Sequence, residues 1–84
     1  MIFDCNGKPI SKYIPKIGDI IVLQSTMIAG FESFVDQIGY VRTIRNLNIE
    51  IFYPSSQKSY PFAKNILDEK KIRYSWIVYS YDDQ

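Results

Sequence analysis

The sequence predicts a mostly-β fold made of a single small domain. Its 84 residues suffice for one domain, and 46% of them are hydrophobic against 23% charged, a balance typical of globular rather than disordered chains. Short runs rich in Ile, Val, Tyr and Phe alternate with turn-forming residues, which is the pattern of short strands. We therefore expect a small five-stranded barrel or a strongly curved antiparallel sheet, with one short helical turn.

The chain divides into three parts along its length: an N-terminal arm (1–17), a β core (18–81) and a polar tail (82–84). The arm should be irregular, because Asn6-Gly7 is a turn signal and Pro9 and Pro15 exclude a regular helix. The first strand of the core is the apolar run Ile20–Leu23. Since both faces of this strand carry apolar side chains, we expect it to be covered on both sides.

The segment 25–38 is compatible with a short helix or with a long loop, and the sequence leaves both interpretations open. Gly30 near its middle favours the loop. The apolar residues of the segment recur at roughly helical spacing, so they should be tucked onto the core in either case: Phe31, Phe34, Val35 and Ile38.

The next two strands form a hairpin. Gly39–Arg45 and Ile49–Tyr53 both have strand composition, and the asparagines of the intervening Asn46-Leu47-Asn48 suit a tight turn. A fourth strand is expected at Ser59–Lys64. Pro61 lacks an amide donor, so this strand should lie at an edge of the sheet or carry a bulge.

One helical turn is expected at 65–71, with Asn65 as its N-terminal cap and Asp68 near the positive end of the helix. The closing strand follows in the stretch IRYSWIVYSY, residues 72–81. Alternation divides it into two rows, and the sequence does not fix which of them faces the core. The row Ile72, Tyr74, Trp76 and Val78 is the more continuously apolar, which favours it as the inner row over Arg73, Ser75, Ile77, Tyr79 and Tyr81.

This order of elements resembles the small barrels of the SH3-like kind over about residues 18–79. The resemblance rests on four segments: Gly18-Asp19-Ile20-Ile21-Val22, Gly39-Tyr40-Val41-Arg42, Ile49-Glu50-Ile51 and the closing strand Ile72–Tyr79. It implies a five-stranded barrel whose long first loop is 24–38. Such barrels host many binding roles, so the resemblance implies a binding module without naming its ligand.

The side-chain inventory argues against an enzyme. The chain has no histidine and a single cysteine, Cys5, which excludes Ser–His and Cys–His nucleophile pairs, an internal disulfide and zinc sites of Cys and His. We expect no cofactor, no metal and no small-molecule substrate. No apolar run approaches the length that spans a bilayer, and the N-terminus lacks the pattern of a secretory signal, so we expect no membrane contact and a cytoplasmic location.

The aromatic and basic residues indicate contact with another macromolecule. Tyr, Trp and Arg are enriched at the energetic centres of protein interfaces, which predicts a partner-binding set: Tyr74, Trp76, Tyr79, Tyr81, Arg73, Arg42, Arg45 and Lys64. We expect a protein partner, as for a phage-encoded inhibitor of a host enzyme, or self-association into a homo-oligomer. The alternative is an RNA- or DNA-binding barrel that uses the basic half 41–75, where cations interleave with rings.

Overall fold

The computed structural model describes residues 1–68 and 70–79. The strands and the two short 3-10 helices follow one another in this order: β1 (Ile2–Phe3), β2 (Ile20–Thr26), η1 (Glu32–Phe34), β3 (Ile38–Ile44), β4 (Asn48–Tyr53), β5 (Lys58–Ala63), η2 (Lys64–Leu67) and β6 (Tyr74–Val78). The mostly-β prediction is therefore confirmed.

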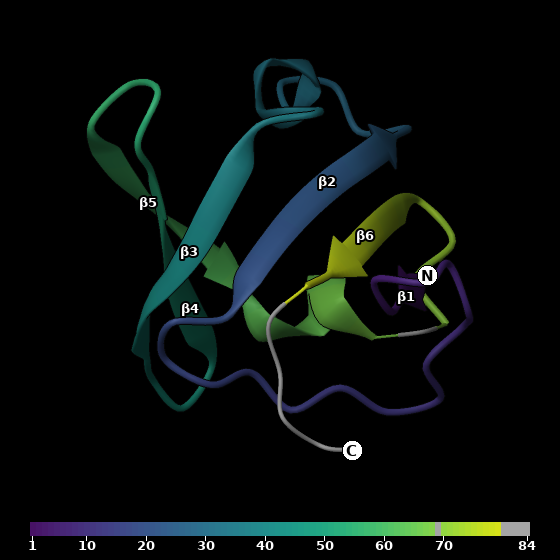
Figure 1. Ribbon diagram of the computed structural model, residues 1–84. Coiled ribbons are helices and arrows are strands. Elements are labelled where there is room, and N and C mark those ends of the chain that lie inside the picture. The colour runs from purple at the N-terminus through teal and green to yellow at the C-terminus, as the bar shows by residue number, and fades with distance from the viewer. Residues whose placement is uncertain (69, 80–84) are drawn as a thin grey trace.

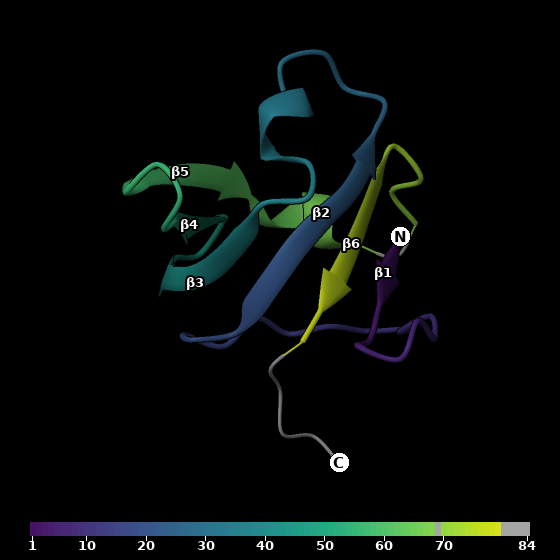
Figure 2. The same ribbon diagram turned by 45° about the horizontal axis from the view of Figure 1, so that its top comes forward.

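The strands form one curved sheet in the order β1-β6-β2-β3-β4-β5. Neighbouring strands are antiparallel except β1 and β6, which run parallel. In Figure 1, β3, β2 and β6 lie in front, whereas β5 and η2 lie behind, and Figure 2 shows the same wrapping from a second angle. The sheet has six strands rather than the expected five, and no ladder joins β1 to β5 in the described chain, so it is not closed into a barrel.

Strand β1 corrects the expectation of a wholly irregular arm. Ile2 pairs with Trp76 and Phe3 with Ile77, so the start of the arm becomes an edge strand beside β6. Ile2 is 1% exposed and belongs to the core. Two residues are too few to show a period-2 pattern, and the pairing joins opposite ends of the chain, so local sequence carries no signal for it.

The hairpin of β3 and β4 is confirmed, and the amide of Arg45 donates to the carbonyl of Asn48 at 2.8 Å across its turn. The edge position expected from Pro61 is confirmed too, because β5 pairs with β4 alone. The amide of Lys64 donates to the carbonyl of Leu47 at 2.9 Å. Bonded and non-bonded pairs alternate along an antiparallel ladder. Pro61, three residues before Lys64, therefore occupies a non-bonded pair with Glu50, where its missing N–H faces away from β4.

The core lies on the inner side of the curved sheet and is rich in aromatic rings. Phe34 stacks on Tyr53 at 5.1 Å between centroids and meets Tyr60 and Phe62 edge-on at 5.0 and 5.2 Å. The segment 25–38 is thus mainly a loop, with only η1 helical, and it packs Phe31, Phe34 and Val35 against the core as expected. Ile38 is the exception, because it opens β3 and is 55% exposed.

The helical turn begins earlier and is shorter than the sequence suggested. Helix η2 spans Lys64–Leu67, its N-terminal cap residue is Ala63, and Asn65 lies inside it, so the expected Asn65 cap is wrong. Burial of Ile66 and Leu67 places this turn on the core. Asp68 follows the helix, and its carboxylate accepts the amide of Lys70 at 2.9 Å.

The rest of the arm is attached to the sheet through Asp19, which is 4% exposed. Its carboxylate accepts the hydroxyl of Tyr13 at 2.7 Å and the amide of Lys16 at 3.0 Å. Its carbonyl accepts the amide of Val41 from β3 at 2.9 Å. Asp19 therefore joins the arm to the entrance of β2 and to the neighbouring strand.

Candidate interaction surface

The outer side of the sheet, opposite the core, carries apolar side chains. In β2, Ile21 and Leu23 are fully buried in the core, so alternation directs Ile20 and Val22 outward. Antiparallel sheets commonly pair an apolar inner face with a polar outer one. Here the outer positions are apolar as well, so the expectation that β2 is covered on both sides holds only for its inner side in the described chain.

The strand register aligns these outward residues into two rows. The first row crosses β1, β6, β2 and β3 through the pairs Phe3–Ile77, Ile77–Val22 and Val22–Ile38. The second row is next to it. Its members come from β2, β3, β4 and the residue after β6: Ile20, Tyr40, Phe52 and Tyr79, whose amide donates to the carbonyl of Ile20 at 2.9 Å.

We call the two rows together the outer apolar face: Phe3, Ile77, Val22, Ile38, Tyr79, Ile20, Tyr40 and Phe52. Three of its members expose much of their surface, Ile38 at 55%, Tyr79 at 48% and Tyr40 at 38%, whereas Ile77 is only 8% exposed and the other four are half-buried. No helix or strand of the described chain crosses it in Figure 1. Contiguous exposed apolar surface on a small domain is typical of an interaction site.

One end of the outer apolar face is hollowed. A shallow depression of about 420 Å³ is lined by Ile17, Gly18, Tyr40, Val41, Arg42 and Phe52. The guanidinium carbon of Arg42 lies 5.7 Å from the ring centroid of Phe52, and Nη1 donates to the hydroxyl of Ser59 at 2.9 Å. These contacts position the cation beside an apolar floor, an arrangement that suits an aromatic or acidic side chain of a partner.

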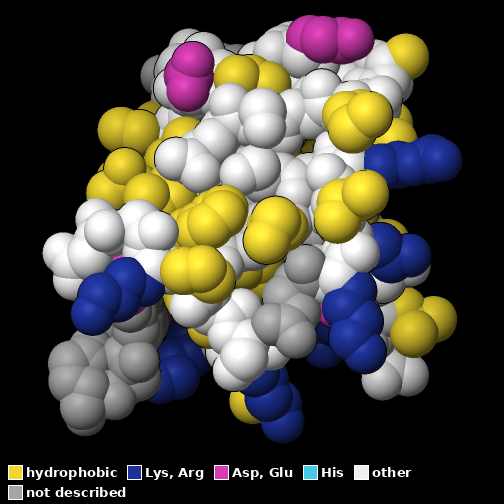
Figure 3. All heavy atoms as spheres, turned by 90° about the vertical axis from the view of Figure 1, so that its right-hand side faces the viewer, with side chains coloured by type: hydrophobic (Ala, Val, Ile, Leu, Met, Phe, Trp, Pro, Cys, Tyr) yellow, Lys and Arg dark blue, Asp and Glu magenta, His cyan; other side chains and the backbone are white. Residues whose placement is uncertain are grey.

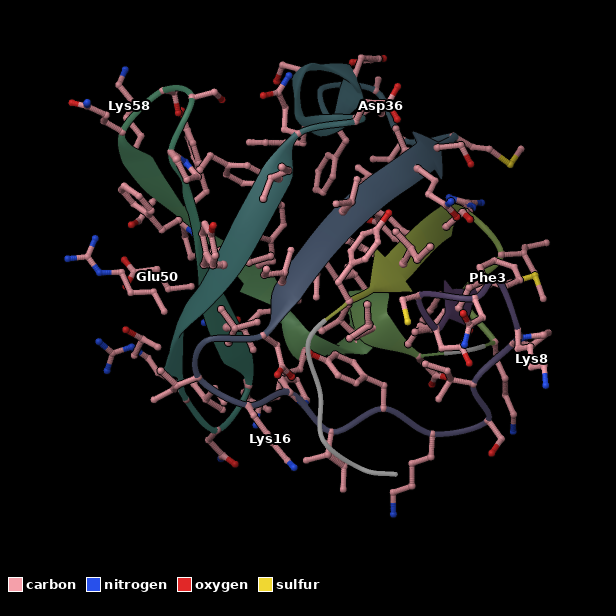
Figure 4. All side chains as sticks on the ribbon, in the orientation of Figure 1. Phe3, Lys8, Lys16, Asp36, Glu50 and Lys58 are labelled. Carbon is pink, nitrogen blue, oxygen red and sulfur yellow. The ribbon has the colours of Figure 1, made fainter. Side chains whose placement is uncertain are left out.

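Charged residues surround the strands of this face. Figure 4 shows Asp36 at the top, Glu50 and Lys58 on the left, Lys16 below, and Lys8 on the right near Phe3. An apolar centre with a polar rim is the usual anatomy of a protein interface. Both signs of charge occur on the rim, so the face is not a uniformly basic track for phosphates.

The closing strand divides as its alternation favoured only within β6, which is shorter than the expected 72–81. Ile72 was expected in the inner row but lies in the turn before β6 and is 74% exposed, and Ile77 of the outer row is only 8% exposed. Trp76 and Val78 are fully buried, and Tyr74 is half-buried with its ring 5.6 Å from that of Phe31. Trp76 is therefore a core residue and Tyr74 packs against the core, so assigning Trp76 to a partner-binding surface is wrong. Its indole is the largest fully buried side chain, and it meets the ring of Phe62 from β5 edge-on at 6.2 Å between centroids.

The remaining predicted site residues lie in several places. Tyr79 belongs to the outer apolar face and Arg42 borders it. Arg45 is exposed at the turn of the hairpin, Lys64 is half-buried in η2, and Arg73 is exposed in the turn before β6. Tyr81 lies outside the described residues. The predicted set is thus not one site.

Sequence reasoning missed most of the outer apolar face: Phe3, Ile20, Val22, Ile38, Tyr40, Phe52 and Ile77. A signal was present in β2, where apolar residues occupy both faces, and at Phe52, which alternates with core positions. Joining these positions into rows required the register between strands, which only the folded sheet supplies.

Among the described residues, no three His, Cys, Asp or Glu side chains lie close enough together to hold a metal ion. Within the same residues, no helix is long and apolar enough to cross a membrane. No protein-family model matches this chain, and neither a curated protein nor a solved structure matches it.

Proposed function

We propose that this protein is a non-enzymatic binding module that contacts another protein through the outer apolar face. The observation that carries the proposal is the alignment of apolar residues into two adjoining rows on the open side of the sheet. Burying an exposed aliphatic or aromatic side chain contributes about 1.5–3 kcal/mol. Ile38, Tyr40 and Tyr79 are therefore the residues from which we expect most of the binding energy.

We further propose that the module is a divergent relative of the SH3-like barrels, opened at the edges. The order of its elements supports this: a long first connection between β2 and β3, a tight β3–β4 hairpin, and the helical turn η2 before the last strand. Binding through exposed aromatic residues fits such a module, and a bacteriophage inhibitor that covers part of a host enzyme is one role of this kind.

The test is affinity capture of partners from the native cell or host with the wild type and with the variants Ile38→Ser and Tyr40→Ser. We expect a defined protein to be retained by the wild type and lost with both variants. The matched control is Leu47→Ser, which removes a side chain that is 74% exposed in the β3–β4 turn, away from the face. Circular dichroism and urea unfolding verify that each variant stays folded.

If the outer-face variants retain the partner, or if Leu47→Ser loses it equally, the outer apolar face is not the binding surface. Light scattering over a range of concentrations tests the self-association version. A dimer that Ile38→Ser dissociates would identify a second copy as the partner, whereas a strictly monomeric wild type excludes that version.

A further inference from the structure

A second hollow lies between η2 and the turn that leads into β6, separate from the outer apolar face. Its volume is about 510 Å³, within the range of small-ligand sites. Three cations from one short turn, Lys70, Lys71 and Arg73, line it, together with Asn65, Ile28 and Tyr74. In Figure 3, which shows the side of the molecule that carries this turn, basic side chains lie along the right and lower parts and the prominent acidic ones at the top.

The turn satisfies its own hydrogen-bond acceptors with backbone donors. The carbonyls of Asp68, Lys70 and Lys71 accept the amides of Lys71, Ile72 and Tyr74 at 2.9, 3.1 and 3.2 Å. The carbonyl of Arg73 accepts the amide of Met27 at 3.0 Å. These bonds occupy backbone amides of the turn as well as its carbonyls. The preference of the hollow for an anion over a cation therefore comes from the cationic side chains that line it, Lys70, Lys71 and Arg73.

The turn is also held in place from outside. The N-terminal ammonium of Met1 donates to the carbonyl of Lys71 at 2.9 Å and to the carbonyl of Tyr74. The carboxylate of Asp68 is directed to the amide of Lys70 at 2.9 Å. The cations thus extend from a backbone that is hydrogen-bonded by two other segments of the chain, at Met1 and at Met27, which lowers the ordering cost of binding a ligand.

We propose that this hollow binds the phosphate group of a small phosphorylated ligand of nucleotide size. A phosphate carries about −1.5 to −2 charge at neutral pH and offers three strong acceptor oxygens, which match several cations at once. The half-buried Ile28 and Tyr74 supply an apolar wall for the rest of the ligand. The ring of Tyr74 is held 5.6 Å from that of Phe31, so this wall is ordered before the ligand arrives.

The test is a titration of the full-length protein with adenosine 5′-monophosphate, in which binding is measured by calorimetry and by changes in the amide NMR shifts. We expect saturable binding that shifts the amides of residues 70–74, weaker binding of inorganic phosphate, and none of adenosine. Lys71→Gln and Arg73→Gln should each weaken binding of the nucleotide about tenfold, since each removes a charge-assisted hydrogen bond. The matched control Lys58→Gln removes an exposed cation at the start of β5 and should leave affinity unchanged.

Several results would overturn the proposal: no saturable binding of the nucleotide, equal binding of adenosine, or equal weakening by Lys58→Gln. A third arm uses a short single-stranded RNA without a terminal phosphate. If that RNA binds and the nucleotide does not, the cations contact a nucleic-acid backbone instead, and the proposal fails. The site is independent of the proposed protein contact, because Ile38→Ser should remove the protein partner and leave nucleotide binding intact.

Discussion

The hydroxyl of Tyr13 donates a hydrogen bond of 2.7 Å to the carboxylate of Asp19, and this contact fixes the arm against the sheet. Asp19 is 4% exposed, and a buried carboxylate is stable only when donors surround it. The amide of Lys16 supplies a second donor to the same oxygen at 3.0 Å. Besides the pairing of β1 with β6, the attachment of the arm therefore rests on one tyrosine and one aspartate that are six residues apart in the chain.

Tyr13→Phe is expected to lower the free energy of unfolding by about 1–3 kcal/mol, because the Asp19 carboxylate loses a donor while remaining buried. Urea unfolding at pH 7 measures the effect. An unchanged unfolding midpoint would show that the hydroxyl contributes nothing to stability.

Tyr53→Phe should leave the free energy of unfolding unchanged or raise it. Tyr53 is 2% exposed, and its hydroxyl has no hydrogen-bond partner among the described residues. Removing an unpaired buried hydroxyl is neutral or stabilising, since the group loses its water on folding and gains no bond. The same urea experiment should give a midpoint equal to or above that of the wild type. A clear loss of stability would reveal a partner for this hydroxyl.

Stability should fall in alkaline solution. Burial raises the pKa of Tyr13, and the hydrogen bond to Asp19 and the charge of that residue raise it further; burial alone raises the pKa of Tyr53. In the unfolded chain both phenols ionise near pH 10. The contribution of these groups is thus fully present below about pH 10 and is lost as pH rises above it, because the unfolded state then releases protons that the folded state retains.

Urea midpoints recorded between pH 8 and pH 11 test this dependence. The double variant Tyr13→Phe and Tyr53→Phe should lose less stability between pH 9 and pH 11 than the wild type does. Equal alkaline losses in the two proteins would contradict the assignment to these tyrosines.

Gly39→Ala should destabilise the sheet by about 1–3 kcal/mol. A Cβ at this position would lie 2.6 Å from Cγ2 of Ile51 and 3.1 Å from Cε1 of Tyr53, so the core beneath β3 has to shift. Thermal unfolding measures the loss. The control is the adjacent Ile38→Ser on the outer face, where a change of about 0.5 kcal/mol or less is expected. Comparable losses in both variants would indicate that β3 is packed on both sides.

Trp76→Ala should unfold the protein or cost about 3–5 kcal/mol, whereas Tyr79→Ala should leave it folded. The two aromatic residues are three apart in the chain, but Trp76 is fully buried and Tyr79 is 48% exposed. Near-ultraviolet circular dichroism and denaturant titration distinguish the two outcomes. A folded Trp76→Ala variant of normal stability would contradict the assignment of Trp76 to the core.

Some elements could be predicted because the residues that determine them are neighbours in the sequence. The hairpin was predictable from two strand-like runs around an asparagine-rich turn, and the edge position of β5 from the missing donor of Pro61. The inner positions Tyr74, Trp76 and Val78 of β6 followed from their apolar continuity, although the same row wrongly included Ile72, which is 74% exposed in the turn before β6. In each case a few neighbouring residues contain the whole physical argument.

Features that depend on distant pairing were not predictable. Strand β1 exists only because β6 offers it an edge, and the start of η2 is set by packing of Ile66 and Leu67 on the core rather than by a capping asparagine. The outer apolar face requires the register of several strands at once. For the same reason the predicted binding set combined core, turn and surface residues that the fold separates.

The position of β6 between β1 and β2 has a consequence for synthesis. The last strand of the described chain pairs with both, and it brings Trp76, the largest fully buried side chain, into the core. A nascent chain on the ribosome therefore cannot complete this core until residues 74–78 have been translated. Until then the edge of β2 stays open and Ile2 has no strand to join, so β1, β2 and β6 must assemble together rather than in chain order.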